Sequence, residues 1–187
     1  MNEEIKNAVK VLRNGGCILF PTDTIWSIGC DATNDEAVNK LLEFNHSITY
    51  DTHILLIDQV GKLQSYIDEV PEIAYDMIEL SDKPITIVYD KLKNLANYFL
   101  TSKSNIGIRV TKESFSQKLC FQFRNPIFTI PAFSKDTNMS NKFVSIPSDL
   151  ETKIDYCVNY KRDDFKSNDN SIIIKLGVDN TFKIIKQ

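Results

Sequence analysis

The chain of 187 residues has few of the side chains that most often build a metal site. It contains two histidines, His46 and His53, and four widely spaced cysteines that form no C-x-x-C pair. Protein zinc is usually held by closely grouped cysteine and histidine ligands. We therefore predict no protein-bound metal, and we expect each cysteine to be a small buried apolar residue in a reducing cytoplasm.

The sequence also lacks an excess of positive charge and any long apolar run. Its 22 Lys and Arg residues stand against 25 Asp and Glu residues, which gives a formal net charge of -3. This balance does not favour nucleic acid as a partner, although a local basic patch stays possible. No apolar run approaches the length of a membrane span, and the first residues are acidic, so we expect a cytoplasmic protein.

Helical and extended patterns alternate along most of the chain. Apolar residues recur at helical spacing in residues 3–14, 34–42, 60–67, 71–80, 92–100 and 114–123. Short β-branched or apolar segments occupy residues 17–20, 53–57, 84–89, 106–110, 126–130, 154–159, 171–176 and 181–185. Polar residues dominate 132–148 and 161–170, which we expect to be a loop and a linker. The alternation predicts an α/β sheet with helical cover, in one domain.

The most informative motif is residues 15–34, which read GGCILFPTDTIWSIGCDATN. An apolar strand runs into a Pro-Thr-Asp-Thr turn, and a second apolar segment then ends at Gly29. Hydroxyl groups at the end of a strand form a ligand-binding edge, because the sheet holds the loop still. The motif resembles the signature of the YrdC family, the threonylcarbamoyl-AMP synthases, which reads close to GG-x3-[FY]-PTDTVYGLGCDAT.

Further segments resemble the same family in the same order. They are SDKPITIV at 81–88, IGIRV at 106–110, NPIF at 125–128, DYCV at 155–158 and SIII at 171–174. Several motifs in order are more specific than any one of them. The resemblance implies one YrdC-like domain over residues 1–187, with a twisted mixed β-sheet and flanking helices around a concave cavity. It also implies synthesis of threonylcarbamoyl-AMP from threonine, bicarbonate and ATP with Mg²⁺, for threonylcarbamoyladenosine modification of tRNA.

The resemblance assigns three residues to the threonine side of the site. Thr24 matches the second threonine of the PTDT motif, Arg109 matches the arginine that grips the threonine carboxylate, and Ser171 matches a serine near threonine. Each residue also has a structural interpretation. Thr22 and Thr24 could cap a turn, Arg109 could pair with a surface carboxylate, and Ser171 could face solvent.

The nucleotide side departs from the family pattern after the second predicted helix. Where the family has K-x-R-P followed by a cation or amide, this chain has Asn45 for the lysine, Ser47 for the arginine and Asp51 beyond them. Two positive charges are lost and one negative charge is gained beside a strongly anionic ligand. At partly buried separations each such change costs a few kcal/mol.

A second departure falls at the family's S-x-N motif. This chain has Pro131 and Phe133 in place of the serine and the asparagine, and neither side chain can donate the same hydrogen bond. Trp26 and Ser27 replace the usual Tyr-Gly after the PTDT motif. Lys186 lies where the family often has an arginine near its nucleotide, and the two cations bind differently.

Three hypotheses follow. The chain is an active synthase in which other cations, among them Lys135, Lys142 or Lys186, cover the phosphates; or it is a non-catalytic small-molecule binder; or it is an RNA-binding paralogue. We favour a divergent member of the family with impaired nucleotide chemistry, and we leave the oligomeric state open.

Overall fold

The computed structural model describes residues 1–44, 52–132, 143, 146, 148–162, 171–179 and 181–186. The helices are α1 (Asn2–Arg13), α2 (Asp35–Glu43), the 3-10 turn η1 (Val60–Lys62), α3 (Leu63–Tyr66), α4 (Glu72–Leu80), α5 (Asn97–Thr101), α6 (Ser114–Phe123) and α7 (Ser148–Lys153). The strands are β1 (Ile18–Pro21), β2 (Trp26–Asp31), β3 (Thr52–Ile57), β4 (Ile85–Val88), β5 (Asn105–Val110), β6 (Ile127–Pro131), β7 (Tyr156–Cys157), β8 (Ile172–Leu176) and β9 (Phe182–Lys186).

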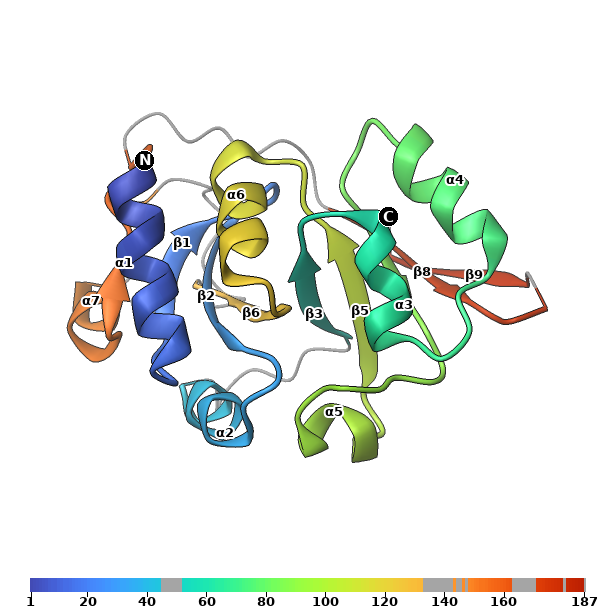
Figure 1. Ribbon diagram of the computed structural model, residues 1–187, viewed down its shortest axis with the longest axis horizontal. Coiled ribbons are helices and arrows are strands. Elements are labelled where there is room, and N and C mark those ends of the chain that lie inside the picture. The colour runs from blue at the N-terminus through green and yellow to red at the C-terminus, as the bar shows by residue number, and fades with distance from the viewer. Residues whose placement is uncertain are drawn as a thin grey trace.

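All of these strands belong to one sheet with the order β7-β1-β2-β6-β3-β5-β4-β8-β9 (Figure 1). Parallel pairs join β1 to β7, β3 to β5 and β4 to β8, and the other neighbours are antiparallel. The sheet is therefore mixed, with helices beside it, and the predicted α/β fold class is confirmed.

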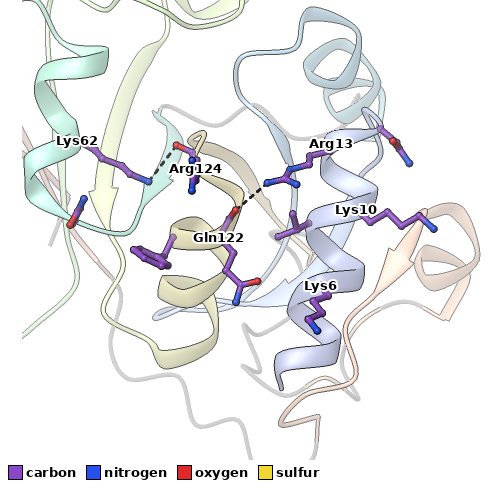
Figure 2. Close-up of a pocket in the computed structure, with 10 residues that line it drawn as sticks. Lys6, Lys10, Arg13, Lys62, Gln122 and Arg124 are labelled. Atoms are coloured by element: carbon purple, nitrogen blue, oxygen red, sulfur yellow. Dashed lines mark hydrogen bonds between the residues drawn. The ribbon is translucent and has the colours of Figure 1, made fainter.

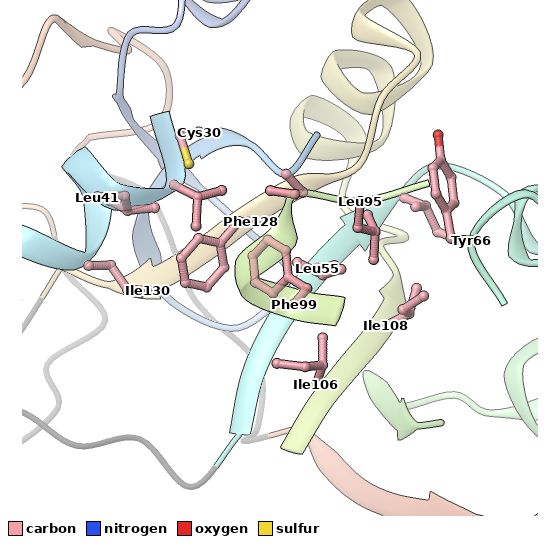
Figure 3. Packing of buried hydrophobic residues seen from close by; sticks show 14 of the residues in the cluster. Cys30, Leu41, Leu55, Tyr66, Leu95, Phe99, Ile106, Ile108, Phe128 and Ile130 are labelled. Carbon is pink, nitrogen blue, oxygen red and sulfur yellow. The ribbon is translucent and has the colours of Figure 1, made fainter. Parts of the chain in front are cut away.

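The helices cover both faces of this sheet. Successive side chains of a strand point to opposite faces, so Leu55 and Leu56 of β3 enter different apolar clusters. Helices α1 and α6 pack side by side over the Leu56 face, and the Arg13 guanidinium of α1 donates a 3.4 Å hydrogen bond to the Gln122 carbonyl of α6 (Figure 2). Helices α2, α3, α4 and α5 contribute to the larger cluster on the Leu55 face, where Phe99 of α5 lies against Phe128 of β6 (Figure 3).

Local capping explains where two helices begin. The Asn34 side chain accepts a 3.1 Å hydrogen bond from the Ala37 amide, which caps α2 as the sequence predicts. The Glu113 carboxylate accepts hydrogen bonds from the first amides of α6, at 2.8 Å each, and α6 keeps its predicted bounds. These caps satisfy amide groups that have no partner inside the helix.

Several predicted elements are shorter than the sequence pattern indicates. The helix expected at 92–100 forms only as α5, because Asn94 has a left-handed φ of 55° and its side chain donates a 2.8 Å hydrogen bond to the Ser65 carbonyl. The strand expected at 154–159 pairs only over two residues as β7, and the helix expected at 60–67 divides into η1 and α3. Helix α7 was not predicted. Most of the expected loop and linker lies outside the described residues.

All four cysteines are free thiols. Cys17, Cys30 and Cys120 are buried, as expected, and Cys157 is half-buried. Across the described ranges, no helix combines the length and apolar character that crossing a membrane requires.

Candidate functional site

Hydroxyl side chains gather on the Leu56 face of the sheet, beyond the part that α1 and α6 cover. We call this set the hydroxyl strip; it comprises Ser27, Thr52, Thr86, Thr129 and Ser171. The strand register places its members on one face. Gly29 opposes Thr129, and Thr129 and Gly107 both oppose Ile54. Gly107 also opposes Val88, and Thr86 opposes Ile173, so the same face continues to β4 and β8. All five members are buried.

Gly107 lies at the centre of this strip, and its missing side chain leaves space over β5. A Cβ atom there would come within 2.5 Å of the Thr86 Cγ2 atom and 3.3 Å of the Thr52 Cγ2 atom. The two threonines therefore approach each other over β5 only because residue 107 has no side chain. The Thr52 hydroxyl is buried and has no hydrogen-bond partner among the described residues.

The loop between β1 and β2 is held by Thr22. Its hydroxyl accepts hydrogen bonds from the amides of Thr24 and Ile25, at 3.3 and 3.2 Å, and donates one to the Ile25 carbonyl at 2.7 Å. The structural interpretation of Thr22 as a turn cap is thus confirmed. The Thr24 hydroxyl lies 3.2 Å from that of Thr22, and Ser27 donates to the same Ile25 carbonyl at 3.3 Å.

A buried ion pair connects this loop to β5. The Arg109 Nε atom lies 3.2 Å from the Asp23 Oδ1 atom, with the two side chains 3% and 8% exposed. The contact is an ion pair without hydrogen-bond alignment, since neither atom makes a hydrogen bond in the described structure. Strands β1 and β2 are not neighbours of β5 in the sheet, so Asp23 brings the PTDT loop over to Arg109.

Ser171 lies at the start of β8, on the other side of β4. It is 8% exposed, so it does not face solvent, and its hydroxyl accepts a 3.4 Å hydrogen bond from Thr86. Ile87 of β4 pairs with Ile108 of β5, and Thr86 and Arg109 are the next residues along the two strands. The structure therefore places Arg109 beside Asp23, the neighbour of Thr24 in the chain, and Ser171 beside Thr86. Sequence reasoning missed Asp23 and Thr86.

Both missed residues carried a detectable signal. Asp23 stands inside the PTDT motif, and Thr86 interrupts an otherwise apolar strand. A hydroxyl in the middle of a buried strand usually has a polar partner, so the sequence predicts a polar neighbour for Thr86.

The nucleotide-side residues are for the most part outside the described structure. This holds for Asn45, Ser47, Asp51 and Phe133, and for the side chain of Lys186, whose backbone ends β9. Pro131 ends β6 opposite Ser27, so it stands beside the hydroxyl strip as a neighbour without a side-chain donor. The interpretation of these positions as a degenerate nucleotide corner stays a prediction.

The face opposite the strip holds His53. Its Nε2 atom lies 2.9 Å from the Tyr98 hydroxyl, and its ring contacts Phe128 edge-on at 5.5 Å. Burial lowers the pKa of His53, so the ring is neutral at pH 7. Within the described part of the chain, no three His, Cys, Asp or Glu side chains group closely enough to hold a metal ion.

The fold is shared with two solved structures. E. coli YciO matches with a TM-score of 0.78 and 18% identity, over 100% of this chain and 90% of its own. The H234A/Y235A variant of P. abyssi Sua5 matches with a TM-score of 0.77 and 20% identity, over 92% of this chain and 53% of its own. The chain therefore has the mixed α/β fold of Sua5 and YciO.

The family follows from the sequence comparisons. The model of the Sua5/YciO/YrdC family, which carries the description "Telomere recombination", matches residues 10–187, and the chain belongs to this family. A threonylcarbamoyl-AMP synthase of Pseudoalteromonas translucida is 28% identical over 158 residues, 83% of this chain and 84% of the relative. A protein of the same name from Hahella chejuensis is 30% identical over 129 residues, 68% of this chain and 70% of the relative.

Proposed function

We propose that this chain binds threonine at the hydroxyl strip and is a divergent threonylcarbamoyl-AMP synthase with impaired nucleotide chemistry. Its relatives carry the synthase name, and one matching Sua5 structure is a complex with L-threonine. In the proposed reaction, the threonine amine attacks bicarbonate, a C–N bond forms, water leaves, and the product is a carbamate. The carbamate oxygen then attacks the α-phosphorus of ATP, so that AMP is transferred to it and pyrophosphate leaves.

The observation that carries this proposal is a pair of buried polar contacts at the predicted residues: Asp23, next to Thr24 in the PTDT loop, pairs with Arg109, and Thr86 bonds to Ser171. Threonine presents one hydroxyl, one amine and one carboxylate, so its site needs small polar groups and a cation. The strip supplies hydroxyl groups, which both donate and accept hydrogen bonds. The Thr52 hydroxyl makes no hydrogen bond to any described residue, so it is free to bond to a ligand.

Arg109 is the proposed ligand of the threonine carboxylate, and its ion pair with Asp23 limits which edge of the guanidinium a substrate can reach. Asp23 approaches the Nε atom. A guanidinium has five N–H donors in a fixed plane, so a second carboxylate can bind along another edge. The proposed division of labour is that Asp23 orients Arg109, while the other edge receives the threonine carboxylate.

The nucleotide side is the proposed weak point. ATP with Mg²⁺ is the second substrate, and the cations that the family places over its phosphates are replaced by Asn45 and Ser47, with Asp51 nearby. Loss of a cation that stabilises a departing pyrophosphate slows phosphoryl-group chemistry. We propose the cytoplasm as the compartment, because all four cysteines are free, and tRNA as the final acceptor of the threonylcarbamoyl group.

Calorimetric titration with threonine, followed by a pyrophosphate-release assay with ATP, Mg²⁺ and bicarbonate, tests the proposal. We expect threonine binding that Ser171→Ala weakens and that Ser104→Ala, an exposed serine control, leaves unchanged. We expect pyrophosphate release that is slow but dependent on threonine. Threonine binding with no release would favour the non-catalytic binder, and the absence of threonine binding would refute the proposal.

A further inference from the structure

A hollow of about 850 Å³ lies between helices α1 and α6 and the turn η1. We call it the basic groove. Its five cations are Lys6, Lys10, Arg13, Lys62 and Arg124 (Figure 2). None of the ten described residues that line it is acidic, and none belongs to the hydroxyl strip.

Four of the five cations are available to a ligand. Lys62 is half-buried and forms an ion pair with Asp58, which neutralises it. Lys6, Lys10, Arg13 and Arg124 are exposed. The described residues provide no carboxylate partner for these four side chains.

Two of the cations are held by backbone carbonyls at the end of α6. Arg13 donates to the Gln122 carbonyl at 3.4 Å, and Lys62 donates to the Arg124 carbonyl at 3.3 Å, so both reach the end of α6 from opposite directions (Figure 2). Cations near the last turns of α1 and α6 also compensate the partial negative charge of a helix C-terminus. That compensation explains one or two positive charges, but not four together around one hollow.

An exposed aromatic ring points to the kind of ligand. Phe121 lines the groove and is 65% exposed, and Asn14, Gln59 and Gln122 also line the groove. Cations bind a phosphate backbone, an exposed ring stacks on an unpaired base, and amides bond to base edges. An acidic peptide would satisfy the cations but has no base to stack on Phe121.

We propose that the basic groove binds a single-stranded nucleic acid segment, with its phosphates on Lys6, Lys10, Arg13 and Arg124 and one base stacked on Phe121. The net charge of -3 does not oppose this, because the excess negative charge is carried by the rest of the chain. Nucleic acid binding responds to the local field of a patch rather than to the net charge.

The test is fluorescence anisotropy with a labelled single-stranded oligouridine of about 12 nucleotides. With about 0.7 units of log–log salt slope for each neutralised phosphate, four cations predict a slope near -3. Affinity should then fall about 50-fold between roughly 50 and 200 mM salt. The double variant Lys10→Gln/Arg13→Gln should halve the slope and weaken binding about tenfold or more at low salt.

Matched controls separate the groove from general charge and hydrophobicity. Lys103→Gln/Lys183→Gln removes the same charge from exposed positions outside the groove and should leave binding within about twofold. Phe121→Ala should weaken binding about fivefold or more. Phe182→Ala removes a similar ring, 63% exposed on β9, and should not weaken it.

Three results would overturn the inference. One is no binding of the oligonucleotide at low salt by the wild-type chain. Another is an equal loss of affinity in the groove variants and their controls. The third is that a polyglutamate peptide of the same charge binds as tightly as the oligonucleotide and that Phe121→Ala does not weaken its binding. That result would identify an acidic protein surface as the partner.

Discussion

Replacing Arg109 with methionine should destabilise the protein much more than breaking an exposed ion pair. At the observed 3.2 Å and an effective dielectric constant near 20, the attraction between Asp23 and Arg109 is about 5 kcal/mol. Methionine keeps much of the apolar stem but leaves the Asp23 carboxylate buried with no cation beside it. Removing one partner of a buried pair costs about 3–5 kcal/mol. For a chain of this size, that loss lowers the melting temperature by roughly 6–20 °C.

Urea unfolding followed by the fluorescence of Trp26, the single and fully buried tryptophan, measures this cost. The control is Lys175→Met, because the Lys175–Asp90 pair is 2.8 Å long but its side chains are 44% and 50% exposed. We expect that control to lose about 1 kcal/mol or less. The double variant Asp23→Asn/Arg109→Met should recover part of the stability, since no buried charge remains.

Equal losses of stability in Arg109→Met and Lys175→Met, within about 0.5 kcal/mol, would show that burial adds nothing to the stabilisation by the ion pair. If Arg109→Met does not fold, Asp23→Asn gives the same comparison with a milder change. An Asp23→Asn variant as stable as the wild type would also contradict the structure.

Three further predictions concern single positions. Gly107→Ala should lower the free energy of unfolding in urea by about 1–3 kcal/mol and weaken threonine binding, because the new Cβ atom would lie 2.5 Å from the Thr86 methyl. The control is Gly61→Ala, whose Cβ atom would meet nothing within 4 Å. Equal losses of stability in the two variants would refute this prediction. Asn34→Ala should lower the free energy of unfolding by about 1 kcal/mol, because the side-chain cap of α2 is lost. Asn39 is exposed on the same helix, so Asn39→Ala should change the stability little. An Asn34→Ala variant as stable as the wild type would contradict the cap. Burial lowers the pKa of His53 below its value of about 6.5 in the unfolded chain, so its contribution to stability is complete above that pH and declines as the pH falls toward the folded value. Unfolding midpoints at about pH 7.5 and 5.5 should therefore differ more in the wild type than in His53→Gln, and equal differences would exclude this role.

Local sequence determined most of the secondary structure. Helix α6 has its predicted bounds and Asn34 caps α2, because periodicity and capping act over a few residues. The α/β class follows from the same patterns, whereas the mixed sheet was implied by the family resemblance. The failures also have local causes that only the folded chain shows. Asn94 adopts a left-handed φ when its side chain bonds to the Ser65 carbonyl, and this contact joins segments that are 29 positions apart.

The sequence by itself also determined the family, since the motifs stand in order along the chain, and it predicts Thr24, Arg109 and Ser171 as the threonine-side residues. Tertiary structure decided which partners these residues have. Asp23 meets Arg109 because the β1–β2 loop crosses to β5, and Thr86 meets Ser171 because β4 and β8 pair. The basic groove has the same origin. The net charge is a sum over the chain, whereas a local field depends on which helices lie side by side, and α1, η1 and α6 become neighbours only when the sheet forms.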